Sequence, residues 1–119
     1  MNKIITISAI AMFSIFNSIN ANAGNVNGPK LMTDSVKAYE SYSYNVIYSG
    51  GKSAKIEVKG YGTTNINCSL VNSDNEEVAI YNSNKGYCEF KWLPEKKSLY
   101  RIVIKNLGDK TNYFVIETN

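Results

Sequence analysis

Between Tyr42 and Asn119 the sequence alternates between apolar and polar residues, which is the period of β-strands that have one buried face. Clusters of Gly, Asn, Asp and Ser separate the alternating segments, and these residue types favour turns. The pattern predicts about seven or eight strands of roughly five to eight residues each. The predicted inward side chains, segment by segment, are Tyr42, Tyr44, Val46 and Tyr48; Ala54, Ile56 and Val58; Ile66, Cys68 and Leu70; Cys88, Phe90 and Trp92; Tyr100, Ile102 and Ile104.

The same pattern decides the fold class. No window carries a helical apolar stripe of useful length, so parallel βαβ units are excluded. Short strands joined by turns predict an all-β protein, an antiparallel β-sandwich or jelly roll. Residues 24–41 are more polar and contain the breaker Gly28-Pro29, so we expect an irregular lead-in there. Within it, residues 30–40 fit either one helical turn or an edge strand.

The first 23 residues have the composition of a secretory signal peptide. Lys3 precedes the apolar run IITISAIAMFSIF, and the small-residue tripeptide Ala-Asn-Ala ends at Ala23. A membrane anchor is the alternative, but the run is shorter than the roughly 20 apolar residues of a spanning helix. Cleavage after Ala23 is therefore predicted. There is no cysteine near Ala23, so the sequence does not indicate a lipoprotein. The bacterial style of the signal predicts a periplasmic or extracellular protein.

The remaining chain has room for one small domain, which we place at residues 42–119 after the lead-in of residues 24–41. The formal net charge of the whole chain is +3, and basic residues alternate with acidic ones instead of clustering. This charge pattern argues against a nucleic acid or a charged membrane surface as a partner. The sequence leaves the oligomeric state open.

Cys68 and Cys88 are the two cysteines of the chain. An even number of cysteines in a small exported domain favours a disulfide. Both lie at inward positions of predicted strands, so a bond between them would cross the core; a pair of free buried thiols is the alternative. Redox chemistry is not indicated, because neither CxxC spacing nor a neighbouring cationic group is visible.

Catalysis has little support in the sequence. The chain contains no histidine, which excludes the Ser-His-Asp triad, the Cys-His pair and histidine-ligated zinc. Phosphate-binding glycine motifs are also missing from the sequence. A paired-carboxylate glycosidase would have to use Glu57, Glu89 or Glu117, which we expect on exposed strand faces. We predict a protein that is not an enzyme and uses no cofactor.

Five segments resemble the bacterial pre-peptidase C-terminal (PPC) domain family and related small exported proteins: YNVIYSGG, AKIEVKGYGTTNINCSL, YCEFKWLP, LYRIVIKNLG and NYFVIETN. The resemblance covers residues 42–119. It implies a jelly-roll β-sandwich that serves as an accessory module of secreted enzymes or as a free-standing protein.

The family's acidic positions that can support calcium fall here on Asn65 and Asn67, which offer neutral oxygens only. Asn72 and Asp74 in the next turn are the remaining weak calcium candidates. The simpler interpretation is a solvated turn in which Asn and Asp side chains bond their own backbone. We predict no metal site.

Candidate binding residues come from the outward positions. Val103, Tyr113 and Val115 would form a small apolar outer patch if the last two strands are neighbours, and such a patch is either a binding face or cover for the lead-in. Tyr61 in a turn and Tyr87 beside Cys88 are further exposed candidates.

Three functions fit these observations. The first is an exported, non-catalytic binding module that recognises a protein or an envelope polysaccharide through aromatic packing or strand addition. The second is an inhibitor or trans-acting partner of a secreted hydrolase, which the PPC resemblance supports indirectly. The third is a structural envelope protein that self-associates through edge strands.

Overall fold

The computed structural model describes residues 5–6, 24–61, 65–83 and 86–119. Most of the predicted signal peptide, and residues 62–64 and 84–85 of two predicted turns, therefore lie outside the described residues. The strands are β1 (Ile5–Thr6), β2 (Lys30–Val36), β3 (Ser41–Tyr48), β4 (Ala54–Gly60), β5 (Ile66–Val71), β6 (Glu77–Ser83), β7 (Tyr87–Trp92), β8 (Ser98–Asn106) and β9 (Asn112–Thr118).

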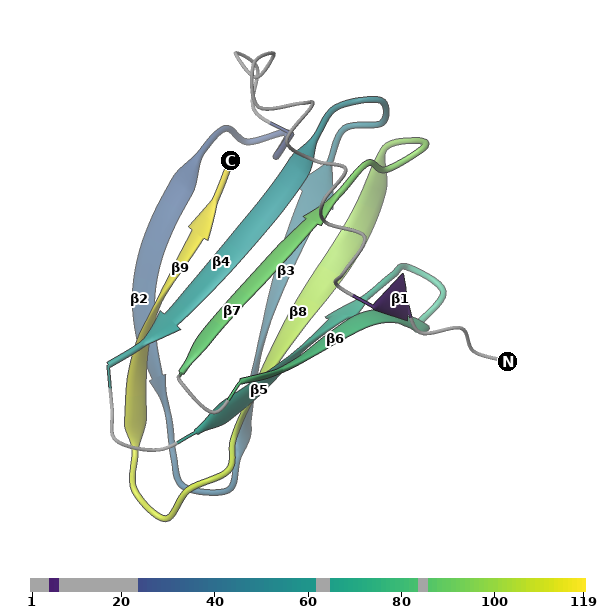
Figure 1. The fold of residues 1–119 in the computed structure, drawn as a ribbon. Helices are drawn as coiled ribbons and strands as arrows, with labels where there is room; N and C mark the ends of the chain where they lie inside the picture. The colour runs from purple at the N-terminus through teal and green to yellow at the C-terminus, as the bar shows by residue number, and fades with distance from the viewer. Residues whose placement is uncertain (1–4, 7–23, 62–64, 84–85) are drawn as a thin grey trace.

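The strands form two facing sheets (Figure 1). Sheet A has the order β1-β6-β5-β8-β3, and sheet B has the order β2-β9-β4-β7. All pairs are antiparallel except β1 with β6. Leaving β1 aside, consecutive strands lie in different sheets except β5 and β6, which pair with each other, and this is the strand order of a jelly roll. The predicted fold class is therefore confirmed.

The lead-in is not irregular throughout: of the two alternatives for residues 30–40, a helical turn or an edge strand, the structure has the edge strand. Residues 30–36 form β2, which pairs along its whole length with β9 and becomes an edge strand of sheet B. Met32 packs against the core and Val36 is buried, while Leu31 and Thr33 point outward. Asp34 stands between Met32 and Val36 along this strand, so the apolar alternation is weak and the sequence fits a helical turn as well as an edge strand.

The predicted inward side chains form the core between the sheets. Ile56, Val58, Ile66, Ile102 and Ile104 are fully buried, and the inward tyrosines of β3 pack against the same cluster. At one end of the sandwich an aromatic group closes the core. The ring centroid of Trp92 lies 5.0 Å from those of Tyr48 and Tyr100, in edge-to-face geometry.

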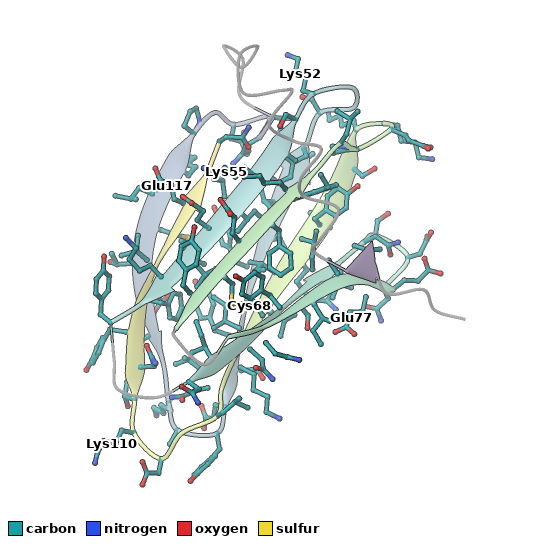
Figure 2. All side chains as sticks on the ribbon, viewed as in Figure 1. Lys52, Lys55, Cys68, Glu77, Lys110 and Glu117 are labelled. Carbon is teal, nitrogen blue, oxygen red and sulfur yellow. A yellow bond between two sulfur atoms is a disulfide. The ribbon has the colours of Figure 1, made fainter. Side chains whose placement is uncertain are left out.

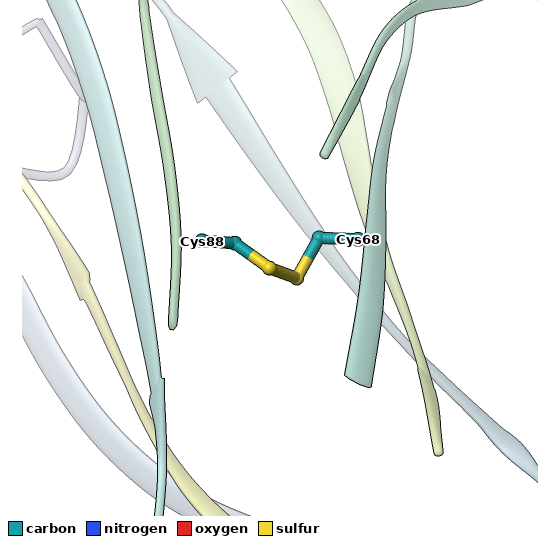
Figure 3. Close-up of a disulfide and its surroundings, with 2 residues drawn as sticks. All are labelled: Cys68 and Cys88. Atoms are coloured by element: carbon teal, nitrogen blue, oxygen red, sulfur yellow. A yellow bond between two sulfur atoms is a disulfide. The ribbon is translucent and has the colours of Figure 1, made fainter. Parts of the chain in front are cut away.

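The predicted disulfide between Cys68 and Cys88 is confirmed (Figure 3). Cys68 lies on β5 of sheet A and Cys88 on β7 of sheet B, with their Cα atoms 6.4 Å apart and both side chains fully buried. The bond therefore links the two sheets directly through the core, 20 residues apart in sequence.

Candidate functional site

The outer face of sheet B is the candidate site. Strand register places side chains from neighbouring strands beside one another there: Leu31, Thr33 and Ser35 of β2; Tyr113, Val115 and Glu117 of β9; Lys55, Glu57 and Lys59 of β4; Tyr87, Glu89 and Lys91 of β7. Figure 2 shows Lys55 and Glu117 among the side chains of this sheet. Each belongs to the outward half of an alternating strand whose other half is buried in the core.

Two adjoining grooves cross this face. One has a volume of about 360 Å³ and runs between β2 and the Tyr61–Tyr113 pair. The other, of about 340 Å³, is lined by Leu31, Glu57, Lys59, Tyr61, Tyr87, Val115 and Glu117. Tyr61 and Val115 line both grooves, so the two form one continuous surface. The backbone N–H of Tyr61 donates to the carbonyl of Tyr113 at 2.6 Å, which fixes the two tyrosines beside each other.

Large side chains stand exposed around these grooves. Leu31 is 68% exposed, Tyr61 64% and Tyr113 62%. A tyrosine ring offers a flat apolar surface together with a hydroxyl that can hydrogen-bond, which suits it to contacts at a wet interface. The three side chains therefore give this face both apolar area and hydrogen-bonding capacity.

A row of glutamates runs across the middle of the face. Glu117, Glu57 and Glu89 are directly opposite one another on β9, β4 and β7, an arrangement that is repulsive unless counter-charges are close. Lys55 supplies one counter-charge, with its Nζ 3.5 Å from Oε2 of Glu57 and 3.9 Å from Oε2 of Glu89. Lys91 Nζ lies 3.8 Å from the same Glu89 oxygen. Glu117 is exposed and forms no ion pair with the described residues.

Glu57 is further held by Tyr87, whose hydroxyl donates to Oε2 of Glu57 at 2.7 Å. Partial burial of Glu57 raises its pKa, but the hydrogen bond from Tyr87 and the charge of Lys55 outweigh burial, so the pKa lies below its ordinary value. The pKa of the Tyr87 hydroxyl is raised by its own partial burial and by the bond to the carboxylate. Glu57 is therefore a fixed anion in the groove.

The Tyr87→Phe substitution should raise the pKa of Glu57 towards its ordinary value, because the hydrogen bond to the carboxylate is lost. A depressed pKa means that Glu57 contributes stability above its unfolded-state pKa and loses the contribution as the pH falls through its folded-state pKa. The variant should lose that contribution at a higher pH. NMR titration of the glutamate carboxyl carbons measures this directly. Tyr113→Phe, which removes an exposed hydroxyl from the same face, should leave Glu57 unchanged; an unaltered pKa in Tyr87→Phe would contradict the assignment.

Four of the five candidate binding residues lie together on this face: Tyr61, Tyr87, Tyr113 and Val115. Val103 does not join them. The condition for a patch shared with Val103, that the last two strands are neighbours, is not met, because β8 belongs to sheet A and β9 to sheet B. Val103 lies on the opposite outer face, between Ser43 and Ser69 of the flanking strands. The lead-in does not cover the patch either, since β2 lies beside β9 in the same sheet.

Sequence reasoning missed Leu31, Lys59 and Glu117 as parts of the groove. Leu31 sits in a segment whose strand character was left open, so its neighbours could not be assigned. The sequence places Glu117 on an exposed strand face, and Lys59 follows the inward Val58 and therefore points outward, but outward position alone does not reveal which strands are adjacent. The signal that could have found them is the jelly-roll order, which places β9 between β2 and β4.

The weak calcium candidates do not gather. Asn65 and Asn67 lie at the start of β5, whereas Asn72 and Asp74 follow its end. Oδ1 of Asn72 accepts hydrogen bonds from the backbone N–H groups of Asp74 and Glu76, both at 2.9 Å, as in a self-bonded Asx turn. Within the described residues, no three Cys, Asp or Glu side chains are grouped so that they could hold a metal ion.

No protein-family model matches the sequence, and no curated protein sequence matches it. In the part of the chain that the structure describes, no helix is long and apolar enough to cross a membrane.

Several solved structures share the fold at low sequence identity. The pre-peptidase C-terminal domain of a collagenase from Bacillus anthracis has a TM-score of 0.58 and 13% identity, over 76% of this chain and 88% of that chain. PliG from Aeromonas hydrophila, a periplasmic lysozyme inhibitor of g-type lysozyme, has a TM-score of 0.53 and 14% identity, over 100% of both chains. The mitogen from Yersinia pseudotuberculosis has a TM-score of 0.54 and 12% identity, over 77% of this chain and 85% of that chain. The chain thus has the PPC-like β-sandwich fold that its sequence motifs predicted.

Proposed function

We propose that this chain is an exported, non-catalytic binding protein that recognises a protein or polysaccharide through the outer face of sheet B. One observation carries the proposal: exposed Leu31, Tyr61 and Tyr113 surround a continuous groove whose floor holds fixed and free charges. The buried disulfide and the predicted signal peptide support a location outside the cytoplasm.

The shape and polarity of the face favour an extended ligand. Sites for small molecules are usually enclosed and mostly apolar, whereas these grooves are open to solvent and cross several strands. Exposed tyrosines with interspersed charges are typical of surfaces that meet another macromolecule. The carboxylate of Glu117 and the ammonium group of Lys59 can bond to sugar hydroxyls or to polar side chains of a protein.

The Tyr61→Ala/Tyr113→Ala double variant should bind the ligand more weakly than the wild type. Both rings contribute exposed contact area without supporting the core, so the variant should bind at least tenfold more weakly, about 1.4 kcal/mol, and still fold. Immobilised protein would be exposed to purified peptidoglycan, to g-type lysozyme and to an extract of the producing cell's envelope, and dissociation constants would then be measured for whatever binds.

Val103→Ala is the matched control, because Val103 is an outward residue of the opposite sheet. Recovery of one component by the wild type and by Val103→Ala, but not by the double variant, supports the proposed site. Equal recovery by all three proteins would mean that the outer face of sheet B is not the binding site.

A second candidate function is inhibition of a secreted hydrolase. The similarity in fold to PliG, whose name describes an inhibitor of g-type lysozyme, favours g-type lysozyme as the first hydrolase to assay. A turbidity assay of lysozyme activity on peptidoglycan separates the candidates. Inhibition that is lost in the Tyr61→Ala/Tyr113→Ala variant favours the inhibitor. Binding to peptidoglycan without any effect on the lysozyme favours the polysaccharide-binding module.

A further inference from the structure

The edge of sheet A formed by β6 is a separate feature from the groove on sheet B. β6 pairs with β5 on one side. On its other side lies β1, whose residues Ile5 and Thr6 are in parallel register with Ala79 and Ile80 (Figure 1). The side of β6 that does not pair with β5 is thus occupied by β1, a segment of the predicted signal peptide. Cleavage after Ala23 would remove that segment.

The other three edges of the sandwich carry features that discourage strand pairing. β2 contains Lys30 and Asp34, and β7 contains Glu89 and Lys91. β3 has no charged residue, but residues 25–26 pair with its end. The backbone N–H of Val26 donates to the carbonyl of Ile47 at 2.9 Å. Charges and covering segments are the usual means by which proteins prevent edge-to-edge association.

Once β1 is removed, none of the described residues pairs with the outer side of β6, and the irregularity in its pairing with β5 lies at its first residues, between Glu77 and Ala79. Its sequence, EVAIYNS, contains no lysine and no proline, and its single charge, Glu77, stands at the first position. Ile80 lies at the middle of the strand, opposite Ser69, and is only half-buried. An uncharged edge with β-branched and aromatic residues is a good template for another strand. The pairing with Ile5–Thr6 shows that the outer side of β6 can pair with another strand at Ala79 and Ile80.

We propose that the β6 edges of two copies pair antiparallel after the signal peptide is removed, giving a two-fold symmetric dimer. A register centred on Ile80 places Ile80 opposite its own copy, which forms a β-branched cross-strand pair. The same register keeps the two Glu77 side chains away from each other, at opposite ends of the pairing. A two-fold contact uses the same edge of both copies, so it ends at a dimer and does not propagate into a fibre.

The inference rests on removal of the predicted signal peptide and is independent of the ligand. Strands β2 to β9 and the disulfide all lie after residue 24, so residues 24–119 contain both sheets of the sandwich. The grooves lie on sheet B, and the proposed contact lies at the edge of sheet A. A dimer could therefore still present two binding faces, and failure of one proposal leaves the other standing.

The test compares oligomeric states. Residues 24–119 should sediment as a dimer at equilibrium over a wide range of protein concentration, whereas the full chain, with β1 on the edge, should be a monomer. Ile80→Lys in residues 24–119 should give a monomer, because two lysines would face each other at the centre of the contact. A synthetic peptide of residues 3–8 should likewise convert the dimer to a monomer by occupying β6.

Val103→Lys is the matched control, since Val103 shares the outer face with Ile80 but lies on an interior strand. It should remain a dimer. Near-ultraviolet circular dichroism and an intact disulfide would show that Ile80→Lys is folded; if it is not, Asn82→Lys at an exposed position of β6 replaces it. A wild-type chain that stays monomeric at every concentration, or a dimer that survives folded β6 variants, would overturn the proposal.

Discussion

Replacing both Cys68 and Cys88 by alanine is expected to lower the free energy of unfolding by about 3 kcal/mol, since the bond closes a loop of 20 residues in the unfolded chain. For a domain of this size the melting temperature should fall by roughly 12–24 °C, because about 1 kcal/mol corresponds to about 4–8 °C. The same bond joins the two sheets, so its loss also removes a direct tie across the core. Thermal unfolding followed by circular dichroism measures the change.

Reduction of the wild-type protein supplies the control for this prediction. A reducing agent should lower the wild-type melting temperature by a similar amount and should leave the double alanine variant unchanged. The variant also loses two buried sulfur atoms, so a larger effect of substitution than of reduction is consistent with the prediction. If reduction leaves the wild-type melting temperature where it was, the disulfide contributes little to stability.

Phe114→Ala should be among the most destabilising single substitutions that do not involve a cysteine. Phe114 is 1% exposed on the inward side of β9, and its ring centroid lies 5.0 Å from that of Tyr42 in edge-to-face contact. Truncation removes this contact and leaves a cavity between the sheets, which costs about 3–5 kcal/mol. Urea unfolding at equilibrium would show this as a lower midpoint at an unchanged slope.

Tyr113→Ala is the matched variant, because Tyr113 precedes Phe114 on the same strand and points outward. Its effect on stability should stay within about 1 kcal/mol, as for most exposed positions. The two neighbours thereby separate roles: Phe114 supports the fold, and Tyr113 belongs to the candidate site. Comparable destabilisation by both variants would contradict the assignment of Tyr113 to an open binding face.

The strands and the core could be predicted because alternation is a local property. At Ile56, Ile66 and Phe90 an apolar residue between two polar ones is enough to assign an inward side chain, and the structure buries all three. The disulfide followed by the same reasoning, since two inward cysteines in a two-layer fold tend to face each other across the core.

The order of the strands within each sheet could not be predicted from the alternation of apolar and polar residues. Val103 and Val115 follow the same outward pattern, yet they lie on opposite faces of the molecule because their consecutive strands, β8 and β9, belong to different sheets. Alternation assigns a side chain to one face of its own strand, and adjacency between strands depends on contacts that are distant in sequence. The sequence does not place Leu31 in the groove for the same reason, since Glu117, its partner across the two strands, lies far along the chain.

In the Gly50-Gly51 turn, the two glycines are required for different reasons. Gly51 has a φ of 77°, a left-handed conformation that favours glycine. Gly50 instead packs directly against the backbone of Lys96, where a Cβ atom would collide. The sequence predicts a turn from both glycines, whereas only the three-dimensional contact explains why the first of them cannot carry a side chain.

The position of β9 has a consequence for the timing of folding. β9 lies between β2 and β4, and its register joins Lys30 to Thr118. Sheet B therefore cannot be complete until β9 has been synthesised, because β9 joins β2 on one side to β4 on the other. Such long-range pairing folds slowly. In the export that we propose, a chain that does not complete sheet B until β9 is made would pass through a narrow secretion channel before it folds.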